Sequence, residues 1–171
     1  MQIRSADPNR DAAACVEIYT PFVTDSVVSF DEVPPSVEEF AAKIAKLSDT
    51  HEFLVAETGN KVSGYAYAGP YRERVAYRWA TEVSVYVHPD HRHEGVGAGL
   101  YRELLKRLRD KGFRIAIAGI TQPNDASMAL HMSLGFTQVG IFQRIGFKLG
   151  AWQDVAFLQL ELAPDAGPPT T

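Results

Sequence analysis

The stretch that most constrains the fold runs from Glu82 to Ala98, where an alternating strand pattern passes through a short turn directly into a helix. Valines alternate with polar and aromatic residues along the strand, so the two sets face opposite sides of a sheet. The turn reads Arg92-x-x-Gly95-x-Gly97. The first amide groups of a helix have no internal partner, and glycines let an anion approach the main chain. The pattern therefore predicts a backbone site for a diphosphate.

Other phosphate-binding motifs fit this turn less well. A P-loop needs Lys followed by Ser or Thr after its last glycine, whereas Gly97 is followed here by Ala98 and Gly99. A dinucleotide-binding fingerprint needs three spaced glycines and an acidic residue about 20 residues later, and the spacing here differs. A glycine-rich turn that only caps a helix remains the alternative to an anion site.

The rest of the sequence alternates between predicted strands and helices. The expected helices cover residues 11–22, 36–47, 97–111 and 124–134, and Ser36 with Glu39 forms a capping-box pattern. The expected strands are 1–4, 53–58, 61–67, 78–87, 113–120, 139–147 and 152–161, with the apolar 113–120 strand covered on both faces. An early helical pair, a central antiparallel sheet and later strand–helix crossovers predict an α/β sandwich with mixed strand directions.

Composition limits the kinds of protein that the chain can be. Its 171 residues suit one domain over residues 1–162, followed by a flexible proline-rich tail over 163–171. The net charge of −4 gives no overall attraction to nucleic acid or to an anionic membrane. The one cysteine, Cys15, cannot form an internal disulfide or a cysteine-based metal site. Without a signal-peptide pattern or a long apolar run, we expect a cytoplasmic protein.

A second motif adds to the diphosphate turn. Asn124, Ser127 and His131 are spaced by three and four residues, so they share one face of a helix. Together with the turn, this arrangement resembles the GNAT superfamily of acetyl-CoA-dependent N-acetyltransferases. The stretches 66–79, 82–87, 130–136 and 146–155 are similar to the phosphinothricin N-acetyltransferase group, which includes enzymes acting on methionine sulfone and methionine sulfoximine. The resemblance covers nearly the whole chain up to the tail, and it implies the GNAT fold, with a twisted sheet between helices.

The resemblance implies acetyl-CoA as cosubstrate and gives roles to individual residues. Glu82 matches the family's catalytic glutamate and is expected to act as general base, directly or through a water, because a free α-amine is largely protonated at neutral pH. His131 is expected to protonate the leaving thiolate or to share the base role. A main-chain N–H in the 85–87 segment would stabilise the developing oxyanion. The residues expected to hold the coenzyme are Val85, Tyr86, Val87, Arg92, His93, Glu94, Gly95, Val96, Gly97, Ala98, Asn124 and Ser127.

The same resemblance implies where the acceptor binds. The residues expected to line its pocket are Phe30, Arg72, Arg74 and Tyr77. Arginines suit a carboxylate, phosphinate or sulfone oxygen, so we expect a small amino-acid-like acceptor. The family also implies a homodimer with the late strands and Trp152 near the interface. The three histidines of the coenzyme turn are not expected to bind a metal. Leu149 replaces a histidine of the phosphinothricin group, so the acceptor can instead be methionine sulfone, methionine sulfoximine or another amino acid.

Three other functions stay open at the level of sequence. A peptide or protein N-terminal acetyltransferase needs an open groove, whereas the arginine-bearing loop suggests a closed pocket for an anionic group. A non-catalytic coenzyme A-binding sensor would need neither Glu82 nor His131, so the presence of both weakens this alternative. A scaffold domain without any ligand would not need the diphosphate turn, so the turn argues against that alternative.

Overall fold

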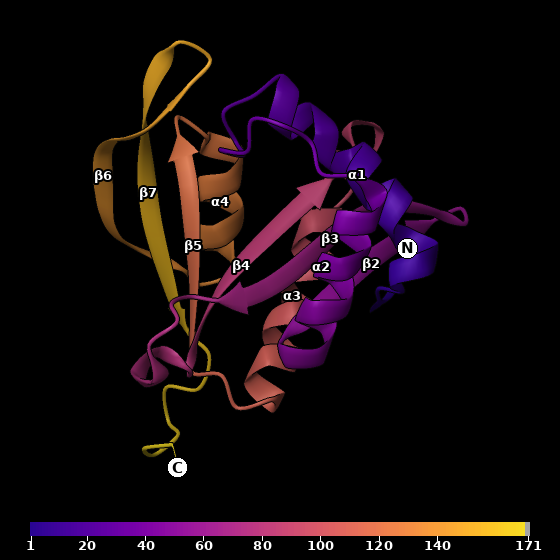
Figure 1. The fold of residues 1–171 in the computed structure, drawn as a ribbon. Coiled ribbons are helices and arrows are strands. Elements are labelled where there is room, and N and C mark those ends of the chain that lie inside the picture. Colours follow the sequence, from indigo (N-terminus) through magenta and orange to yellow (C-terminus); the bar gives the residue numbers. More distant parts are fainter. Residues whose placement is uncertain (170–171) are drawn as a thin grey trace.

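Seven strands form one sheet in the computed structural model, which describes residues 1–169, in the spatial order β1-β2-β3-β4-β5-β7-β6 (Figure 1). Their bounds are β1 Gln2–Ser5, β2 Glu52–Thr58, β3 Lys61–Pro70, β4 Ala80–Val87, β5 Ile115–Gln122, β6 Thr137–Lys148 and β7 Ala151–Glu161. Strands β4 and β5 pair in parallel, and all other neighbours pair antiparallel. The predicted mixed, mostly antiparallel sheet is confirmed.

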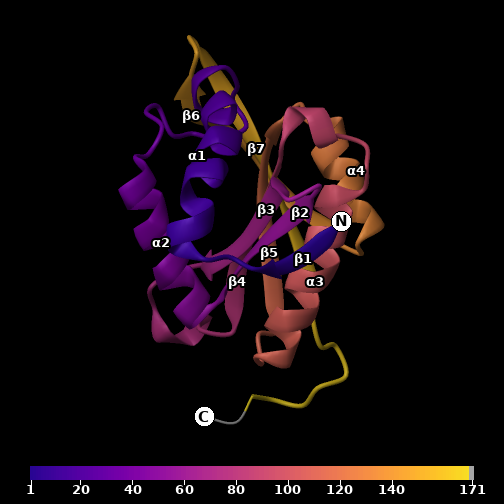
Figure 2. The ribbon, with the colours of Figure 1, turned by 90° about the vertical axis from the view of Figure 1, so that its right-hand side faces the viewer.

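Helices cover both faces of this sheet, as Figure 2 shows. Helices α1 (Pro8–Thr24) and α2 (Val37–Thr50) lie on one face, and α3 (Val96–Asp110) and α4 (Asp125–Ser133) lie on the other. Two short 3-10 turns, η1 (Val75–Tyr77) and η2 (Pro89–His91), flank β4. None of the helices within residues 1–169 is both long and apolar enough to cross a membrane. The predicted sandwich of helices around a sheet is therefore present.

Helix α1 begins earlier than the sequence predicts. Asp7 is its N-cap, and the Asp7 carboxylate accepts hydrogen bonds from the N–H groups of Asn9 and Arg10. Pro8 occupies the first turn, where an N–H has no helical partner in any case. The helix therefore starts at Pro8 rather than at the predicted Asp11.

Strand β4 begins later than predicted. Residues 75–77 form a 3-10 turn, and the N–H of Arg78 donates to the carbonyl of Val75. This bond uses the main chain of Arg78 within the turn, so the strand starts at Ala80 and not at Arg78.

Strand β5 is buried along one face and, apart from Thr121, accessible along the other, which corrects the expectation that both faces are covered. Ala116, Ala118 and Ile120 are buried beneath the α3 and α4 layer. The alternate residues Ile117 and Gly119 stay partly or fully accessible. Successive side chains of a strand face opposite sides, and α1 and α2 lie over β2, β3 and β4 instead, so this face of β5 borders open space.

Each face of the sheet has its own hydrophobic core. Under α1 and α2 the core is aromatic, and the stacked rings of Phe53 and Tyr65 are 5.6 Å apart. Under α3, the predicted stripe of Leu100, Leu104 and Leu108 is fully buried. Burying one such side chain stabilises the fold by about 1.5–3 kcal/mol. Both helical layers are therefore held firmly to the sheet.

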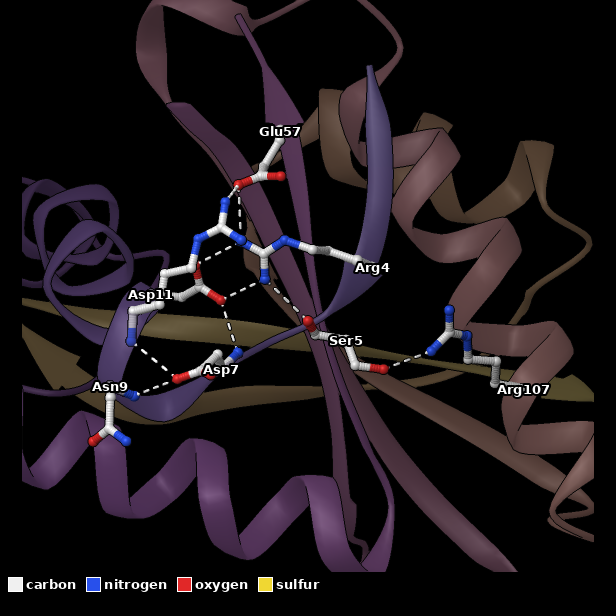
Figure 3. A network of polar contacts seen from close by, with 8 residues as sticks. Arg4, Ser5, Asp7, Asn9, Asp11, Glu57 and Arg107 are labelled. Atoms are coloured by element: carbon white, nitrogen blue, oxygen red, sulfur yellow. Dashed lines mark hydrogen bonds and ion pairs between the residues drawn. The ribbon is translucent and has the colours of Figure 1, made fainter. Parts of the chain in front are cut away.

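A partly buried ion-pair network ties β1 to α1 and β2 (Figure 3). Arg4 donates two hydrogen bonds of 2.6 and 2.7 Å to the Asp11 carboxylate and one of 2.9 Å to Glu57. Arg10 also donates to Glu57. Burial alone would raise the pKa of Asp11, but hydrogen bonds from Arg4 and the Asp7 N–H, with nearby positive charge, hold the pKa below its usual value. The network fixes the N-terminal strand and helix to the sheet edge.

Strands β4 and β5 separate along their length. Their parallel ladder joins Ala80–Glu82 to Ile115–Ile117 only. Beyond Glu82 the two strands diverge, although β4 continues to Val87 and β5 to Gln122 (Figure 1). Strand β4 stays paired with β3 up to Val87, so its position is fixed. Beyond Glu82, its main-chain groups on the β5 side no longer pair with β5. The result is a gap at the centre of the sheet.

The chain after β7 continues without regular structure. The Leu162 N–H donates to the Arg114 carbonyl at 2.8 Å, and residues 163–169 contain no helix or strand. Residues 170 and 171 of the predicted tail lie outside the described residues. The division into a domain over 1–162 and a flexible tail stays a prediction.

Candidate functional site

A narrow cavity of about 60 Å³ occupies the gap between β4 and β5. Its lining residues are Val83, Ser84, Val85 and Tyr86 of β4, Ala118, Gly119, Ile120 and Thr121 of β5, Tyr101 of α3, and Asn124, Ser127 and His131 at α4. One further lining residue, Val28, comes from the connection between α1 and α2. Separated strands offer unpaired main-chain groups that can bind an extended ligand. The cavity therefore suits a slim polar chain.

The N-terminus of α3 opens beside this gap, and within residues 1–169 it is the one α-helix start without a side-chain cap. Gly95 takes the N-cap position with φ of 79°, in the left-handed region that favours glycine. The Gly99 N–H donates to the Gly95 carbonyl at 2.9 Å and makes the first helical bond. The amides of residues 96–98 therefore remain available to an anion, as the sequence predicts.

The side chains around this helix start differ in their exposure. Arg92, His93 and Glu94 are exposed, and the Glu94 carboxylate lies 2.8 Å from Nδ1 of His91. The Val96 side chain is buried, so only its main chain can face a ligand. A Cβ placed on Gly97 would lie 3.5 Å from Val87 Cγ2; this helix start therefore packs directly against β4.

Helix α4 brings the three predicted polar residues to the gap. Asn124 is the N-cap, and its Oδ1 accepts the Ser127 N–H at 3.1 Å. Asn124, Ser127 and His131 all line the cavity, so the prediction that they share a face holds in the structure. Asn124 is thus both a structural cap and a cavity residue. Its side-chain nitrogen takes no part in the capping hydrogen bond.

His131 is held at both ring nitrogens. Nδ1 lies 2.8 Å from the Ser127 carbonyl, and Nε2 lies 3.0 Å from the Tyr101 hydroxyl. A carbonyl only accepts, so Nδ1 carries the proton and Nε2 accepts from Tyr101. The imidazole is 3% exposed, and this burial lowers the pKa of His131, against a smaller opposite effect of the Ser127 carbonyl. The ring is therefore neutral at neutral pH.

Tyr101 is a site residue that the sequence analysis did not identify. It follows Leu100 in the amphipathic helix α3, is 1% exposed, and matches a core position by its pattern. Only the spatial approach of α4 places its hydroxyl against His131 in the cavity. No signal in the sequence separates this tyrosine from a packing residue.

Glu82 is the last β4 residue that pairs with β5, so it stands where the gap begins. It also lines a second cavity of about 440 Å³ on the open face of β5, together with Tyr71, Arg72 and residues of β6 and β7. Its side chain is exposed at the mouth of this cavity, yet surrounding protein atoms displace part of the water, and this burial raises the pKa of the Glu82 carboxyl. A carboxylate with a raised pKa suits proton transfer.

The predicted acceptor residues divide into two groups. Arg72 lines the cavity beside Glu82, with its guanidinium carbon 5.1 Å from the centre of the Tyr71 ring. Arg74 and Tyr77 do not line either cavity. Tyr77 instead packs edge-on against Tyr71 at 5.6 Å. The structure thus brings Glu82, Arg72 and the unpredicted Tyr71 together.

Phe30 does not line either cavity. Its ring covers Gly146 of β6 so closely that no Cβ fits at Gly146. The residue of the same connection that faces the gap is Val28. Sequence alone could not make this distinction, because the connection has no regular period that fixes which side chains point inward.

A third cavity of about 590 Å³ lies away from the strand gap, between α1, the β2–β3 turn and η2. Its charged lining residues have both signs and include Arg10, Lys61, Glu17 and Asp90. It includes neither Glu82 nor the start of α3, so its size does not make it the reaction site. Within residues 1–169 no three His, Cys, Asp or Glu side chains gather into a group that could hold a metal ion.

Comparisons with known proteins agree with this geometry. The family model of the acetyltransferase (GNAT) domain matches residues 3–157. Phosphinothricin N-acetyltransferase of Streptomyces viridochromogenes is 39% identical over 168 residues, which cover 98% of this chain and 91% of that protein. L-methionine sulfoximine/L-methionine sulfone acetyltransferase of Salmonella typhimurium is 37% identical over 169 residues, 98% of each chain.

A solved structure is similar over the same extent. The crystal structure of a GNAT superfamily phosphinothricin acetyltransferase from Sinorhizobium meliloti, in complex with acetyl-CoA, superimposes with a TM-score of 0.94. It is 38% identical and covers 99% of this chain and 92% of that chain.

Proposed function

Because this chain belongs to the GNAT family of acetyltransferases, we propose that it acetylates the amino group of a small amino-acid-like acceptor with Glu82 as its general base. The chain is an acetyl-CoA-dependent N-acetyltransferase. The observation that carries the proposal is the position of Glu82, whose strand borders the narrow gap and whose carboxyl faces the wider cavity. The carboxylate would thus face an acceptor amine in the wider cavity, next to the end of the gap in which the thioester would lie.

We place the coenzyme diphosphate at the uncapped start of α3. The free amides of residues 96–98 and the exposed Arg92 support this placement, since both favour a doubly charged anion. The pantetheine arm would then enter the gap and pair with the main chain of 83–87. Asn124 would contact the arm through its side-chain nitrogen, because its oxygen already caps α4.

The reaction begins with removal of a proton from the acceptor ammonium by Glu82, directly or through a water. The free amine attacks the thioester carbon, a new C–N bond forms and the C–S bond breaks; the second proton of the attacking nitrogen passes to the leaving thiolate, which departs as the thiol. A main-chain N–H freed between the strands would bind the developing oxyanion. Proton removal at Glu82 is favoured by its raised pKa, which lies closer to the pH at which the enzyme works.

We assign His131 a positioning role in this scheme. Its neutral Nε2 accepts from Tyr101 and carries no proton to give, so the geometry favours Tyr101 rather than the imidazole as the group nearest the leaving sulfur. The Tyr101 hydroxyl has a single proton, so it would have to release Nε2 of His131 and turn toward the sulfur before it could donate to the thiolate. This differs from the direct acid role that the sequence resemblance implies.

We propose that the acceptor carries an anionic or strongly polar oxygen group. Arg72 beside Glu82 supports this, because a guanidinium binds carboxylate, phosphinate or sulfone oxygens well. Methionine sulfoximine, methionine sulfone and phosphinothricin all combine an amine with such oxygens. Arg74, Tyr77 and Phe30 lie outside the cavity as described, so any contact with the acceptor would need the connecting segments to move.

We also propose a homodimer, a cytoplasmic location and an autonomous domain over residues 1–162. The homodimer is supported by apolar side chains exposed on the edge strand β6 and its hairpin, namely Val139, Ile141, Phe142, Ile145, Phe147 and Trp152. The location is supported by the charged cosubstrate, which does not cross membranes unaided. If the intact chain sediments as a monomer, the proposed homodimer is wrong. If truncation after residue 162 abolishes activity, the proposed domain boundary is wrong.

The acetylation assay tests the proposed function. Purified protein with acetyl-CoA should release thiol when methionine sulfoximine, methionine sulfone or phosphinothricin is added, and mass spectrometry should find the product heavier by one acetyl group. Short peptides with free N-termini should release far less thiol. Peptide acetylation without any amino-acid acetylation would favour the peptide enzyme, and coenzyme binding without either would favour the sensor.

A further inference from the structure

One lining residue of the strand gap, Val28, comes from a connection far from the other walls in the sequence. Residues of β4, β5, α3 and α4 supply the other walls, and Val28 comes from the connection between α1 and α2. Its side chain is 40% exposed, so it covers the cavity from the outside rather than forming part of either core.

The position of Val28 relative to the coenzyme site is informative. The start of α3 and the polar residues of α4 lie on one face of the sheet, and α1, α2 and their connection lie on the other (Figure 2). A coenzyme arm that enters from the α3 and α4 side therefore points its acyl end toward the α1 and α2 side. With the coenzyme placed as proposed above, the acyl end would there meet Val28, in a cavity of only about 60 Å³.

Polar contacts hold this part of the connection in place. The Tyr19 hydroxyl lies 2.6 Å from Ser29 Oγ and donates to Asp31 Oδ2 at 2.7 Å. Lys148, at the end of β6 and 6% exposed, donates from Nζ to the Ser29 carbonyl at 2.6 Å. Such a charge-assisted bond is stronger than a neutral one. The residue next to Val28 is therefore fixed to both α1 and the β6–β7 hairpin.

Phe30 adds a packing contact on the other side of Ser29. Its ring covers Gly146, where no Cβ fits. The connection and the hairpin tip lie side by side in both ribbon views (Figures 1 and 2). The main chain around Val28 therefore cannot retreat to admit a larger group without breaking several contacts.

We propose that Val28 limits the transferred group to acetyl and that Lys148 acts as the positioning residue that holds Val28 at the acyl end of the gap. The inference rests on the proposed function and adds the selection of the acyl donor to it. One methylene in a fitted apolar pocket changes selectivity by about 10- to 200-fold. The unmodified enzyme should accordingly favour acetyl-CoA over propionyl-CoA by at least about tenfold in kcat/KM.

The test compares acetyl-, propionyl- and butyryl-CoA as donors to one acceptor. Val28→Ala should reduce the preference for acetyl-CoA by about tenfold or more, because it removes the two methyl groups that face the acyl chain. Val33→Ala is the matched control: Val33 lies in the same connection, is 78% exposed and lines neither cavity. It should leave the preference unchanged. An equal preference in Val28→Ala and the unmodified enzyme would overturn the proposal.

A second variant separates positioning from general damage to the fold. Lys148→Met removes the bond to Ser29 and should also relax donor selectivity, while in the Val28→Ala background it should change selectivity little. Fully additive effects of the two substitutions would contradict a role through Val28. Failure of the unmodified enzyme to use acetyl-CoA would instead reject the proposed function, so the two failures are distinct.

Discussion

The Nε2 atom of His131 accepts a hydrogen bond from the Tyr101 hydroxyl at 3.0 Å, which joins α4 to α3 at the wall of the strand gap. The other ring nitrogen is held by the Ser127 carbonyl. Both nitrogens are thus satisfied with a single proton on the ring, and burial disfavours a second proton.

His131 should remain neutral below the pH at which free histidine titrates. Its folded-state pKa is lowered from the ordinary value of 6.5, so the unfolded chain binds more protons than the native chain as the pH falls. The stabilising contribution is complete above about pH 6.5 and declines as the pH falls toward the folded pKa. Nitrogen-15 NMR of the ring should report the Nδ1–H tautomer at pH 7, and a titration midpoint above 6.5 would contradict this.

Glu82→Gln should lower kcat by about 10²- to 10⁴-fold, since that is the usual contribution of a positioned base. The affinity for acetyl-CoA, measured by calorimetry, should stay unchanged. Because burial raises the pKa of Glu82, the rate of the unmodified enzyme should fall as the pH decreases through this raised pKa. The rate of the variant should not show this decrease. Glu161→Gln, at the exposed end of β7, serves as control, and equal losses in both would refute the base assignment.

Arg72→Ala should raise the KM for the acceptor by about tenfold or more, because it removes a hydrogen-bond donor to a charged group. The KM for acetyl-CoA should not change. Arg78→Ala provides the comparison, since Arg78 stacks over Trp79 and lines neither cavity. If both variants keep the original acceptor KM, the acceptor binds elsewhere.

Asp11→Asn should destabilise the protein by about 1–3 kcal/mol, because it weakens charge-assisted hydrogen bonds of a half-buried ion pair while Arg4 keeps Glu57 as a partner. The remaining Arg4 guanidinium would keep its charge without the bidentate partner. The pKa of Asp11 is lowered, so its contribution is complete above about pH 4 and is lost as the pH falls further. Urea unfolding at pH 7 measures the change, and Asp110→Asn, in an exposed pair with Lys106, should unfold like the unmodified chain.

The sequence predicted the fold and the uncapped start of α3 well for physical reasons. Local sequence patterns were predicted correctly: the alternating valines in β4, the capping box at Ser36 and the leucine stripe of α3 are all present in the structure. The uncapped start of α3 follows from Gly95, which has no side chain that could cap it.

The acceptor side was less accessible to sequence reasoning. Val28 and Tyr71 lie in irregular segments, where no period fixes the direction of a side chain. Tyr101 follows the helical pattern of a core residue, and its polar role arises only from contact with His131. The exposed face of β5 was missed because a run of apolar residues does not reveal whether α1 and α2 extend over it.

The central claim is that the gap beyond Glu82 receives the thioester while the amides at the start of α3 hold the diphosphate. A crystal structure of the protein with acetyl-CoA tests it most directly. The account predicts the diphosphate within hydrogen-bond distance of the amides of residues 96–98, the pantetheine arm along the main chain of 83–87, and the acetyl methyl group against Val28. A coenzyme bound elsewhere, with the gap between β4 and β5 closed or empty, would contradict it.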